Sequence, residues 1–393
     1  MAANSGSAVD DFSIGIEEEY LLVDPATGDL AGRTDVQEAV IEQVQSEIDD
    51  SIGMVTPEFL KAQVEVGTAI CYSIHEVREK LGRLRGAVAR AARDQGLAAI
   101  AASTHPTAHW ASVQHTDKER YNMLAHDLQG VARRLVICGM HVHVGFEEDD
   151  HRIDLLGQIA YFLPHLLALS TSSPFWQGSD SGLKCYRLAV FDELPRTGLP
   201  EKFENWGEYQ RHVQVLIDAG LIKDASKIWW DVRAHYKFPT IEMRIPDICT
   251  RLEDGIAVAA LYACILSMLQ RLRRSNQRWR SYSNMLIQEN RWRAQRYGFD
   301  EGLVDFGLGK IGDFDGLLEE ILELTAPDQE RLNCARECAH ARTILQRGTS
   351  AHHQLRVYYE ALGQGADKDA ALKAVVDWLV SETVVGLDAE IST

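Results

Sequence analysis

Apolar and charged residues alternate, as in a β-strand, in the segment Ile14-Gly15-Ile16-Glu17-Glu18-Glu19-Tyr20-Leu21-Leu22. This alternation indicates which face of the expected sheet is apolar and which is charged. Side chains two residues apart point to the same face of a strand. The apolar face carries Ile14, Ile16, Tyr20 and Leu22, and the opposite face carries Glu17 and Glu19. Glu18 is the exception, a charge on the apolar face, and we expect it to reach the edge of the sheet.

Three further segments repeat this arrangement of one apolar and one charged face. The polar positions are Gln63 and Glu65 in 62–66, His141 and His143 in 138–144, and Glu242 and Arg244 in 240–245. For any one strand, the plain alternative is a polar face that meets water. Faces of that kind usually mix Thr, Ser and Lys, whereas these four carry carboxylates, imidazoles and a guanidinium. We therefore predict that the four faces line one trough that binds a ligand.

Carboxylates that converge in such a trough would repel one another unless cations lay between them. The four carboxylates are Glu17, Glu19, Glu65 and Glu242. Their oxygens suit Mg²⁺, which binds through a few carboxylates and substrate phosphates, and Arg244 adds a planar fork for phosphate. The pattern predicts phosphoryl transfer from Mg-ATP. Since the sequence has no Gly-rich P-loop, kinase motif set or GxGxxG, metal and arginine would hold the phosphates.

Composition limits the classes of partner. The chain has 393 residues, with 40 Lys and Arg against 58 Asp and Glu, and a formal net charge of −18. This charge disfavours nucleic acid, whose binding depends on basic side chains, and anionic membranes. Small-molecule substrates are the expected partners. The start of the chain has no signal peptide pattern, so we expect a cytoplasmic protein.

Seven cysteines occur without any CxxC pair. Most have apolar neighbours, and we expect them to be reduced thiols in the core. Cys334 and Cys338 lie four apart on a predicted helix, but no second pair is spaced to complete a zinc site.

Strands and helices are mixed in the first 250 residues, and helices dominate afterwards, which indicates an α+β fold. The pattern predicts strands at 13–23, 58–67, 97–103, 135–146 and 235–245, and helices at 75–95, 116–131, 153–171 and 206–219. The apolar segment 255–270 is too short to span a bilayer comfortably and is predicted to be a buried helix. We expect residues 1–11 to be a disordered leader and 12–393 to be a single catalytic domain.

The sequence resembles the glutamate–cysteine ligase type 2 family of carboxylate–amine ligases. The resembling motifs occur in the expected order at 15–20, 57–58, 65, 104–106, 120–121, 140–144, 186–187, 194–198, 241–244, 289–292 and 377–379. The resemblance implies a glutamine synthetase-like fold, in which helices back an antiparallel sheet that forms an active-site trough, with a helical C-terminal third. It also implies that ATP phosphorylates a carboxylate and that an amine attacks the acyl phosphate. The usual substrates are L-glutamate, through its γ-carboxylate, and L-cysteine or another amine.

Roles for single residues follow from the same resemblance. It implies that the Mg²⁺ (or Mn²⁺) ligands are Glu17, Glu19, Glu65, His141 and Glu242. Arg244 would hold the transferring phosphate, while Arg120 and Arg187 would bind ATP phosphates or the α-carboxylate of an amino acid. Tyr121 and His143 would support these groups, Tyr121 at the nucleotide. The residues alone leave two alternatives for Glu58, a metal ligand or an exposed residue at the start of a strand, and we favour the second.

Two other functions fit parts of the pattern. A zinc-dependent hydrolase would use His141 and His143, but the further carboxylates and Arg244 exceed what one zinc ion needs. A non-catalytic metabolite-binding protein would keep the trough without turnover. The extensive helical surface makes a homo-oligomer a reasonable expectation.

Overall fold

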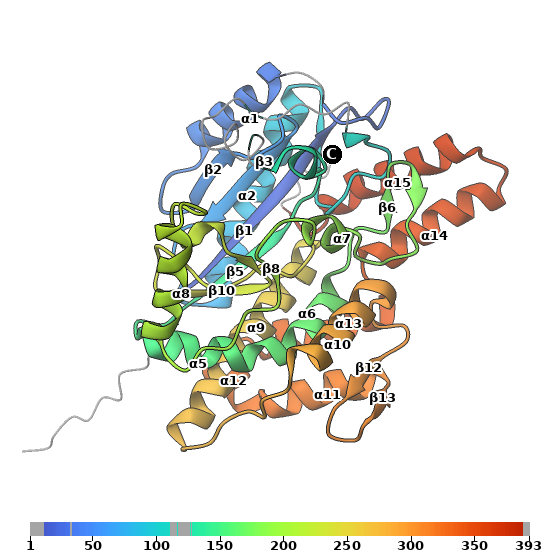
Figure 1. The fold of residues 1–393 in the computed structure, drawn as a ribbon. Helices are drawn as coiled ribbons and strands as arrows, with labels where there is room; N and C mark the ends of the chain where they lie inside the picture. Colours follow the sequence, from blue (N-terminus) through green and yellow to red (C-terminus); the bar gives the residue numbers. More distant parts are fainter. Residues whose placement is uncertain (1–11, 32–33, 111–115, 117–125, 127, 388–393) are drawn as a thin grey trace, which may run out of the picture.

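An antiparallel sheet lies at the centre of the protein (Figure 1). The computed structural model describes residues 12–31, 34–110, 116, 126 and 128–387, and the statements below concern these residues. The strand order is β10-β11-β5-β1-β3-β2, and β4 pairs with the end of β1. The seven strands are β1 Ile14–Val23, β2 Gly53–Pro57, β3 Gln63–Thr68, β4 Ala98–Ile100, β5 Met140–Gly145, β10 Val232–Ala234 and β11 Thr240–Met243.

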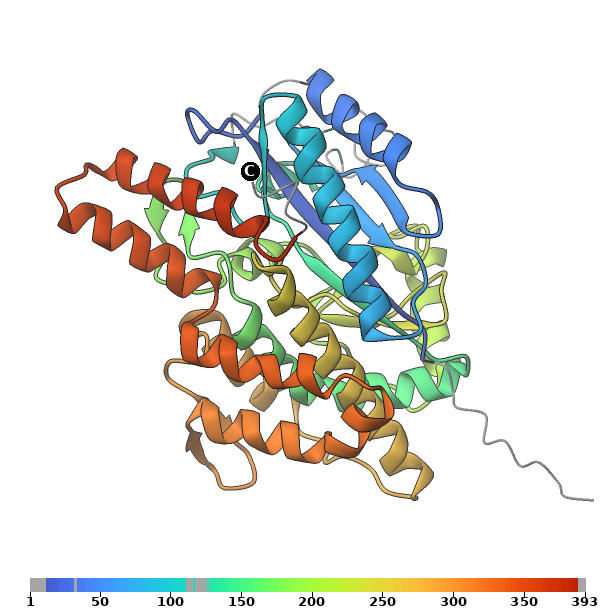
Figure 2. The same cartoon turned by 180° about the vertical axis from the view of Figure 1, so that it is seen from behind.

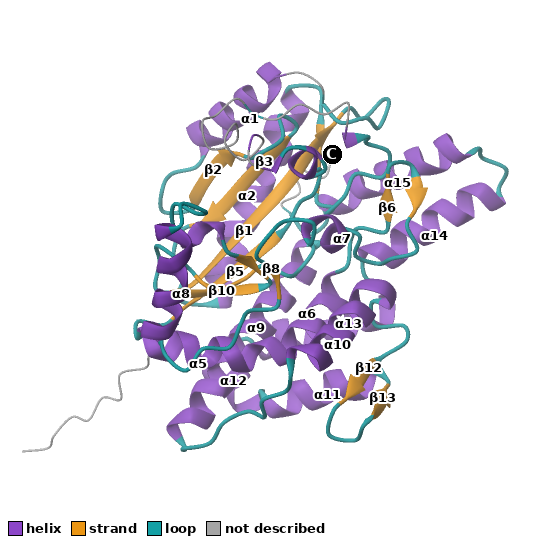
Figure 3. Cartoon of the chain, viewed as in Figure 1, coloured by secondary structure: helices purple, strands orange, loops and turns teal. Residues whose placement is uncertain are grey.

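Helices form most of the remaining structure, as Figure 3 shows. They are α1 Thr34–Glu47, α2 Ile74–Asp94, α4 Gly130–Arg133, α5 Asp149–Ile159, α6 Leu163–Ser170, α7 Arg187–Phe191, α8 Trp206–Asp218, α9 Leu252–Arg274, α10 Asn284–Tyr297, α11 Phe314–Leu324, α12 Ala326–Arg331, α13 Ala335–Arg347, α14 Ser350–Gly363 and α15 Lys368–Thr383, with 3-10 turns at Ala160–Phe162 and Ala225–Lys227. Short pairs join β6 Phe175–Trp176 to β7 Ser179–Asp180, β8 Thr197–Gly198 to β9 Trp229–Trp230, and β12 Leu303–Asp305 to β13 Lys310–Gly312.

The apolar face of the sheet packs against helices. Figure 2 shows α2 lying along the back of the sheet, where it contacts β1, β3 and β4, and α9 contacts β5. On β1, Ile16, Tyr20 and Leu22 are at most 1% exposed, as expected for the strand face that turns toward covering helices. The opposite, charged face of β1 faces the trough.

Two stretches are long and apolar enough to cross a membrane by length and composition, 149–170 and 252–274. In their most apolar windows, 83% and 94% of the residues are buried inside the protein. Burial of this extent is typical of core helices. The prediction of a buried helix at 255–270 is confirmed by α9.

Glu18 is buried, and the expectation that it reaches the edge of the sheet is wrong. β1 is an interior strand, with β5 on one side and β3 on the other. The Arg85 guanidinium on α2 donates to both Glu18 carboxylate oxygens, at 2.7 Å from Nη2 to Oε1 and 3.1 Å from Nε to Oε2. The Tyr20 hydroxyl also donates to Glu18. The charge is tolerated on the apolar face because its partners compensate for the lost hydration.

Removing one member of this pair should destabilise the protein strongly. Glu18→Gln is expected to lower the free energy of unfolding by about 3 kcal/mol, because it leaves the Arg85 charge buried without its counterion. Urea unfolding measures this. The double replacement Glu18→Leu with Arg85→Met should be less destabilised than Glu18→Gln. Equal stability of Glu18→Gln and the wild type would contradict the assignment.

Several predicted elements differ from the observed ones. The predicted strand 58–67 is correct only from Gln63 onward, where β3 begins, because 58–62 form the turn between β2 and β3, in which the backbone N–H of Gln63 donates to the Leu60 carbonyl. Strand β2 was not predicted. The predicted strand 235–245 is shortened because 236–239 form the turn between β10 and β11. Helix α1 and the β12–β13 hairpin were not predicted. The predicted helix 116–131 and the leader 1–11 lie largely or wholly outside the described residues.

Candidate active site

Cross-strand register brings the charged side chains together. In an antiparallel pair, residues directly opposite each other lie on the same face. Glu19 on β1 is opposite Glu65 on β3, and Glu17 is opposite His141 on β5. His143 is opposite Glu242 on β11, which is in turn opposite Arg233 on β10. The four charged faces therefore form one continuous surface across five strands.

This surface lines a cavity of about 440 Å³. All five predicted metal ligands and Arg244 line it, namely Glu17, Glu19, Glu65, His141, Glu242 and Arg244. The rim away from the sheet carries Trp229, His235, Tyr236 and Phe238 from the segments on either side of β10. The predicted trough is thus present, with polar groups on its floor and aromatic groups at its mouth.

The first candidate cation site consists of Glu17, His143 and Glu242. Each offers a ligand atom, and these atoms lie within 4.8 Å of one another. Glu17 joins the two histidines, since its Oε2 lies 3.0 Å from His141 Nδ1 and its Oε1 lies 3.5 Å from His143 Nε2. Burial works to raise the pKa of Glu17, but these histidine contacts outweigh it and hold the pKa well below its usual range.

The second candidate cation site consists of three carboxylates, Glu19, Glu58 and Glu65, again with ligand atoms within 4.8 Å of one another. Burial and the neighbouring Glu58 charge raise the pKa of Glu19 to about 8. The same two causes raise the pKa of Glu65 well above its usual range. Carboxylates that suppress one another's ionisation in this way favour a bound divalent cation.

Glu58 was expected to be an exposed residue at the start of a strand, and this is wrong. It follows directly after β2, is half-buried, and turns into the cavity beside Glu19 and Glu65. The β2–β3 turn places it there. The sequence contained one signal, since Pro57 and Glu58 form one of the motifs by which the chain resembles the family.

Glu19 is held in place by Gln63, which was predicted to lie on a trough-lining face, and by Gly139, which was not singled out. The backbone N–H of Gly139 donates to Glu19 Oε2 at 2.8 Å, and the Gln63 amide donates to the same oxygen at 3.1 Å. A side chain at Gly139 would come within 2.5 Å of the Arg187 guanidinium. A larger residue at this position would therefore force the Arg187 guanidinium to shift.

Two guanidiniums face Glu242. Arg233 donates to both of its oxygens, at 2.7 Å from Nε and 3.2 Å from Nη2, and Arg244 donates to Oε1. Burial opposes ionisation of Glu242, but Arg244 and Arg233 outweigh it, so the pKa of Glu242 lies below its usual range. Arg233 was missed in the sequence, although its position between Val232 and Ala234 shows strand alternation.

One hydrogen-bond donor of Arg244 is unpaired among the described residues. Its Nε is buried and has no hydrogen-bond partner among the described residues. An unpaired buried donor is costly, and a guanidinium fork presented to a cavity matches the oxygens of a phosphate or carboxylate. The unpaired Arg244 donor suits an anionic ligand bound beside the carboxylates.

Arg187 lies behind Arg244. It is 2% exposed and donates to the backbone carbonyls of Arg244 at 3.0 Å and Ile245 at 3.2 Å. It also lines a smaller cavity of about 130 Å³ that adjoins the main one and includes Lys227 and Phe191. Its predicted role toward a substrate carboxylate or ATP stays a prediction. Arg120 and Tyr121 lie outside the described residues.

The donor set fits a hard divalent cation. Among the described residues, five carboxylates and two imidazoles converge and no thiolate joins them, which is the chemistry of Mg²⁺ or Mn²⁺ rather than of a structural zinc site. Burial and Arg244 lower the pKa of His141 to about 4, so the ring is neutral near pH 7 and able to donate a lone pair. We find the residues present consistent with the implied metal.

Glu58→Gln is expected to reduce ATP turnover by roughly tenfold or more, because it removes one carboxylate of the second cation site and thereby weakens cation binding. Steady-state ADP release at rising Mg²⁺ concentration measures this, and part of the loss should be recovered at high Mg²⁺. As a matched control, Glu204→Gln changes an exposed carboxylate outside the cavity. Unchanged turnover and Mg²⁺ dependence in Glu58→Gln would remove Glu58 from the site.

Comparison with known structures supports the fold. A crystal structure of glutamate–cysteine ligase from Francisella tularensis in complex with AMP superposes with a TM-score of 0.66 at 13% identity, covering 97% of this chain and 91% of that one. A bifunctional glutathione synthetase from Pasteurella multocida gives a TM-score of 0.64, covering 94% of this chain and 52% of that one, also at 13% identity. At these identities the likeness concerns the fold alone, and it agrees with the predicted α+β architecture.

Comparison of sequences finds relatives of much higher identity than the solved structures. The chain is 60% identical over 380 residues to a Rhodospirillum rubrum protein named "Putative glutamate--cysteine ligase 2", covering 96% of this chain and 97% of that one. It is 50% identical over 377 residues to a protein of the same name from Jannaschia sp. (strain CCS1), covering 96% and 98%. The family model of glutamate–cysteine ligase family 2 matches residues 13–377. The sequence motifs, the trough and these matches agree, and the chain belongs to glutamate–cysteine ligase family 2.

Proposed function

We propose that this protein joins the γ-carboxylate of L-glutamate to the amine of L-cysteine, at the expense of ATP and through an acyl phosphate. Membership of the family supports an ATP-dependent ligase. The observation that carries the mechanism is the pairing, on one sheet face, of two carboxylate-rich cation sites with Arg244, whose Nε is buried and unpaired among the described residues.

In this proposal the cation sites hold Mg²⁺ or Mn²⁺. Glu19, Glu58 and Glu65 hold one ion, and Glu17, Glu242 and a histidine hold another. When bound, the ions offset the negative charge of the ATP phosphates. His141 and His143 orient Glu17 from either side, through the contacts at 3.0 and 3.5 Å.

Arg244 binds the γ-phosphoryl group during transfer. One carboxylate oxygen of the substrate attacks the γ-phosphorus as the bond to ADP breaks, which gives the acyl phosphate and ADP. The amine then attacks the acyl carbon, loses a proton, and displaces inorganic phosphate. The released phosphate contains the carboxylate oxygen that attacked the γ-phosphorus. Arg233 contributes by pairing with Glu242, so that Arg244 is not the sole counterion of that carboxylate.

The smaller cavity suits the amino-acid part of a substrate. It combines Arg187 and Lys227 with Phe191, Leu194 and Ile137, and it shares Glu19 and Arg244 with the main cavity. A cationic and apolar lining next to the phosphoryl position is suited to an α-carboxylate held beside the reacting group. We assign the α-carboxylate of L-glutamate to this cavity.

An ADP-release screen tests the proposal. Purified protein with Mg-ATP and L-glutamate is supplied with L-cysteine or with other small amines, and the products are identified by mass. ADP release that requires both substrates, together with γ-glutamylcysteine, is the expected result. Turnover only with another amine would reject L-cysteine, and ADP release with none would reject the ligase. The comparisons give no support for the zinc-hydrolase alternative.

A further inference from the structure

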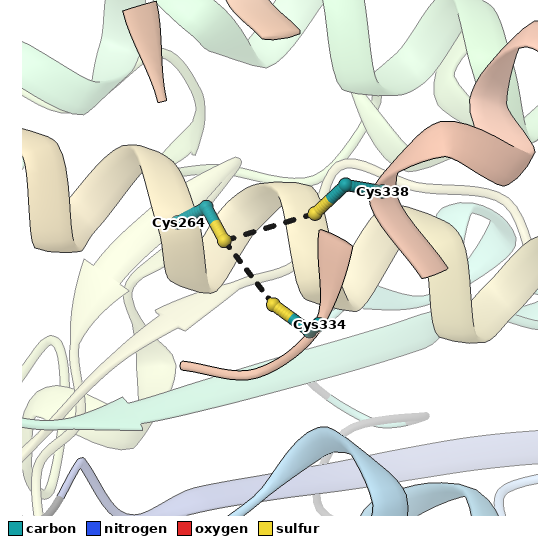
Figure 4. A group of neighbouring side chains, drawn as sticks. All are labelled: Cys264, Cys334 and Cys338. Carbon is teal, nitrogen blue, oxygen red and sulfur yellow. Dashed lines mark hydrogen bonds between the residues drawn. The ribbon is translucent and has the colours of Figure 1, made fainter. Parts of the chain in front are cut away.

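Three cysteines that are distant in sequence meet in the core, away from the trough (Figure 4). Cys264 lies in the middle of α9, and Cys334 and Cys338 lie at the start of α13. All three side chains are fully buried. Cys264 Sγ is 3.4 Å from Cys334 Sγ and 3.7 Å from Cys338 Sγ, and all three sulfurs lie within 4.8 Å of one another.

The helical geometry produces this cluster. Cys334 is the N-cap of α13, and Cys338 lies one turn further on, where its backbone N–H donates to the Cys334 carbonyl at 3.0 Å. Positions four apart on a helix share a face, so both thiols point toward α9. The sequence showed the spacing of these two cysteines, but Cys264 is 70 residues away from Cys334 and only packing of α9 on α13 brings it to them.

The sulfur separations fit three ligands of one metal ion. Ligands at about 2.3 Å from a tetrahedral centre are about 3.8 Å apart, close to the two shortest separations here. A disulfide would require about 2.05 Å between sulfurs. The seven cysteines of the protein are free thiols, as the sequence predicted.

The electrostatic environment favours the thiolate form of Cys334. The free N–H groups at the start of a helix stabilise negative charge, and Cys334 occupies that position on α13. His75, half exposed at the surface, donates from Nε2 at 2.9 Å to the carbonyl of Asn333, the residue before Cys334. The chain therefore reaches the surface at His75 close to the cluster, although the three cysteines themselves are buried.

We propose that Cys264, Cys334 and Cys338 form a binding site for a thiophilic metal ion of the Zn²⁺ class, separate from the catalytic trough. Soft thiolate ligands select such ions, whereas the carboxylates of the trough select Mg²⁺. Binding replaces three thiol protons with three sulfur–metal bonds and releases the protons to solvent. The ion cross-links α9 to α13, and so ties the C-terminal helices to the helix that backs the sheet.

Titration with Cd²⁺ tests the site in the full-length reduced protein, with millimolar Mg²⁺ present to occupy the trough. The Cd–thiolate charge-transfer absorption in the near ultraviolet reports only sulfur ligation. The expected result is one equivalent of Cd²⁺ per chain, displaceable by Zn²⁺, with an increase in Tm on binding. Cys264→Ser should weaken binding more than about 100-fold, because even an outer-shell partner of a metal contributes 10–100-fold.

Two control variants make the outcome decisive. Cys71→Ser and Cys138→Ser replace buried cysteines outside the cluster and should keep the full charge-transfer signal. If Cys264→Ser folds poorly, Cys338→Ala provides the same test from α13. Absence of the signal in the wild type, its persistence in Cys264→Ser and Cys338→Ala, or its loss in Cys138→Ser would overturn the proposal. A stoichiometric Cys264–Cys334 disulfide in freshly purified protein would overturn it as well.

Discussion

Replacing Glu17 or Glu19 by Gln should reduce ATP turnover by roughly 10²–10³-fold while the protein stays folded. Each carboxylate belongs to a different candidate cation site, so each replacement removes an oxygen ligand from one site. A bound cation supplies several kcal/mol of transition-state stabilisation at sites of this kind, and each 1.36 kcal/mol is tenfold in rate. Steady-state ADP release at saturating substrates measures the loss, and circular dichroism verifies the fold.

Glu18→Gln is the matched control for this experiment, since it makes the same chemical change on the same strand but on the opposite face. It should lower stability through the loss of the ion pair with Arg85, while the folded fraction keeps most of its turnover. Turnover near the wild-type level in both Glu17→Gln and Glu19→Gln would contradict the metal assignment. A greater loss of turnover in Glu18→Gln than in Glu17→Gln or Glu19→Gln would also contradict the metal assignment.

Arg244→Ala is expected to stop ADP release, and Arg244→Lys is expected to recover only a small part of it. Lysine keeps the charge but loses the planar fork with its fixed donors. Loss of a preorganised donor to the charge that develops in the transition state typically costs roughly 10²–10³-fold. The measurement is ADP release combined with the melting temperature of each variant.

The competing explanation is that Arg244 serves only as a partner of Glu242. In that case Arg244→Ala would lower the melting temperature while the folded fraction kept its specific activity. Isotope transfer tests the chemistry independently, because substrate carboxylate labelled with ¹⁸O should pass one label to inorganic phosphate. Phosphate that stays free of label during wild-type turnover would rule out the acyl phosphate.

The strand pattern was predictable because it is local. The two-residue alternation of 14–22 and 140–144 separates charged from apolar side chains whatever lies beside these strands. The structure has the four charged faces where the alternation indicated. The buried helix α9 was predictable for the same reason, since its apolar composition does not depend on its neighbours.

Features that depend on turns and on neighbours were not predictable in this way. The turn between β2 and β3 brings Glu58 into the cavity, and the pairing of β10 with β11 brings Arg233 to Glu242. His143 joins the first cation site because it is opposite Glu242 in the register of β5 and β11. A shift of one residue in that register would have turned Glu242 to the other face, away from His143.

The sequence by itself determined which residue types carry the chemistry, and through its ordered motifs it determined the family. Tertiary structure alone decided which of those residues meet. It placed Glu18 against Arg85 rather than at an edge, because β1 is an interior strand covered by α2. It also brought Cys264 to Cys334 and Cys338, because α9 packs on α13. Alternation along one strand is set by local backbone geometry, whereas register and helix packing depend on the whole chain.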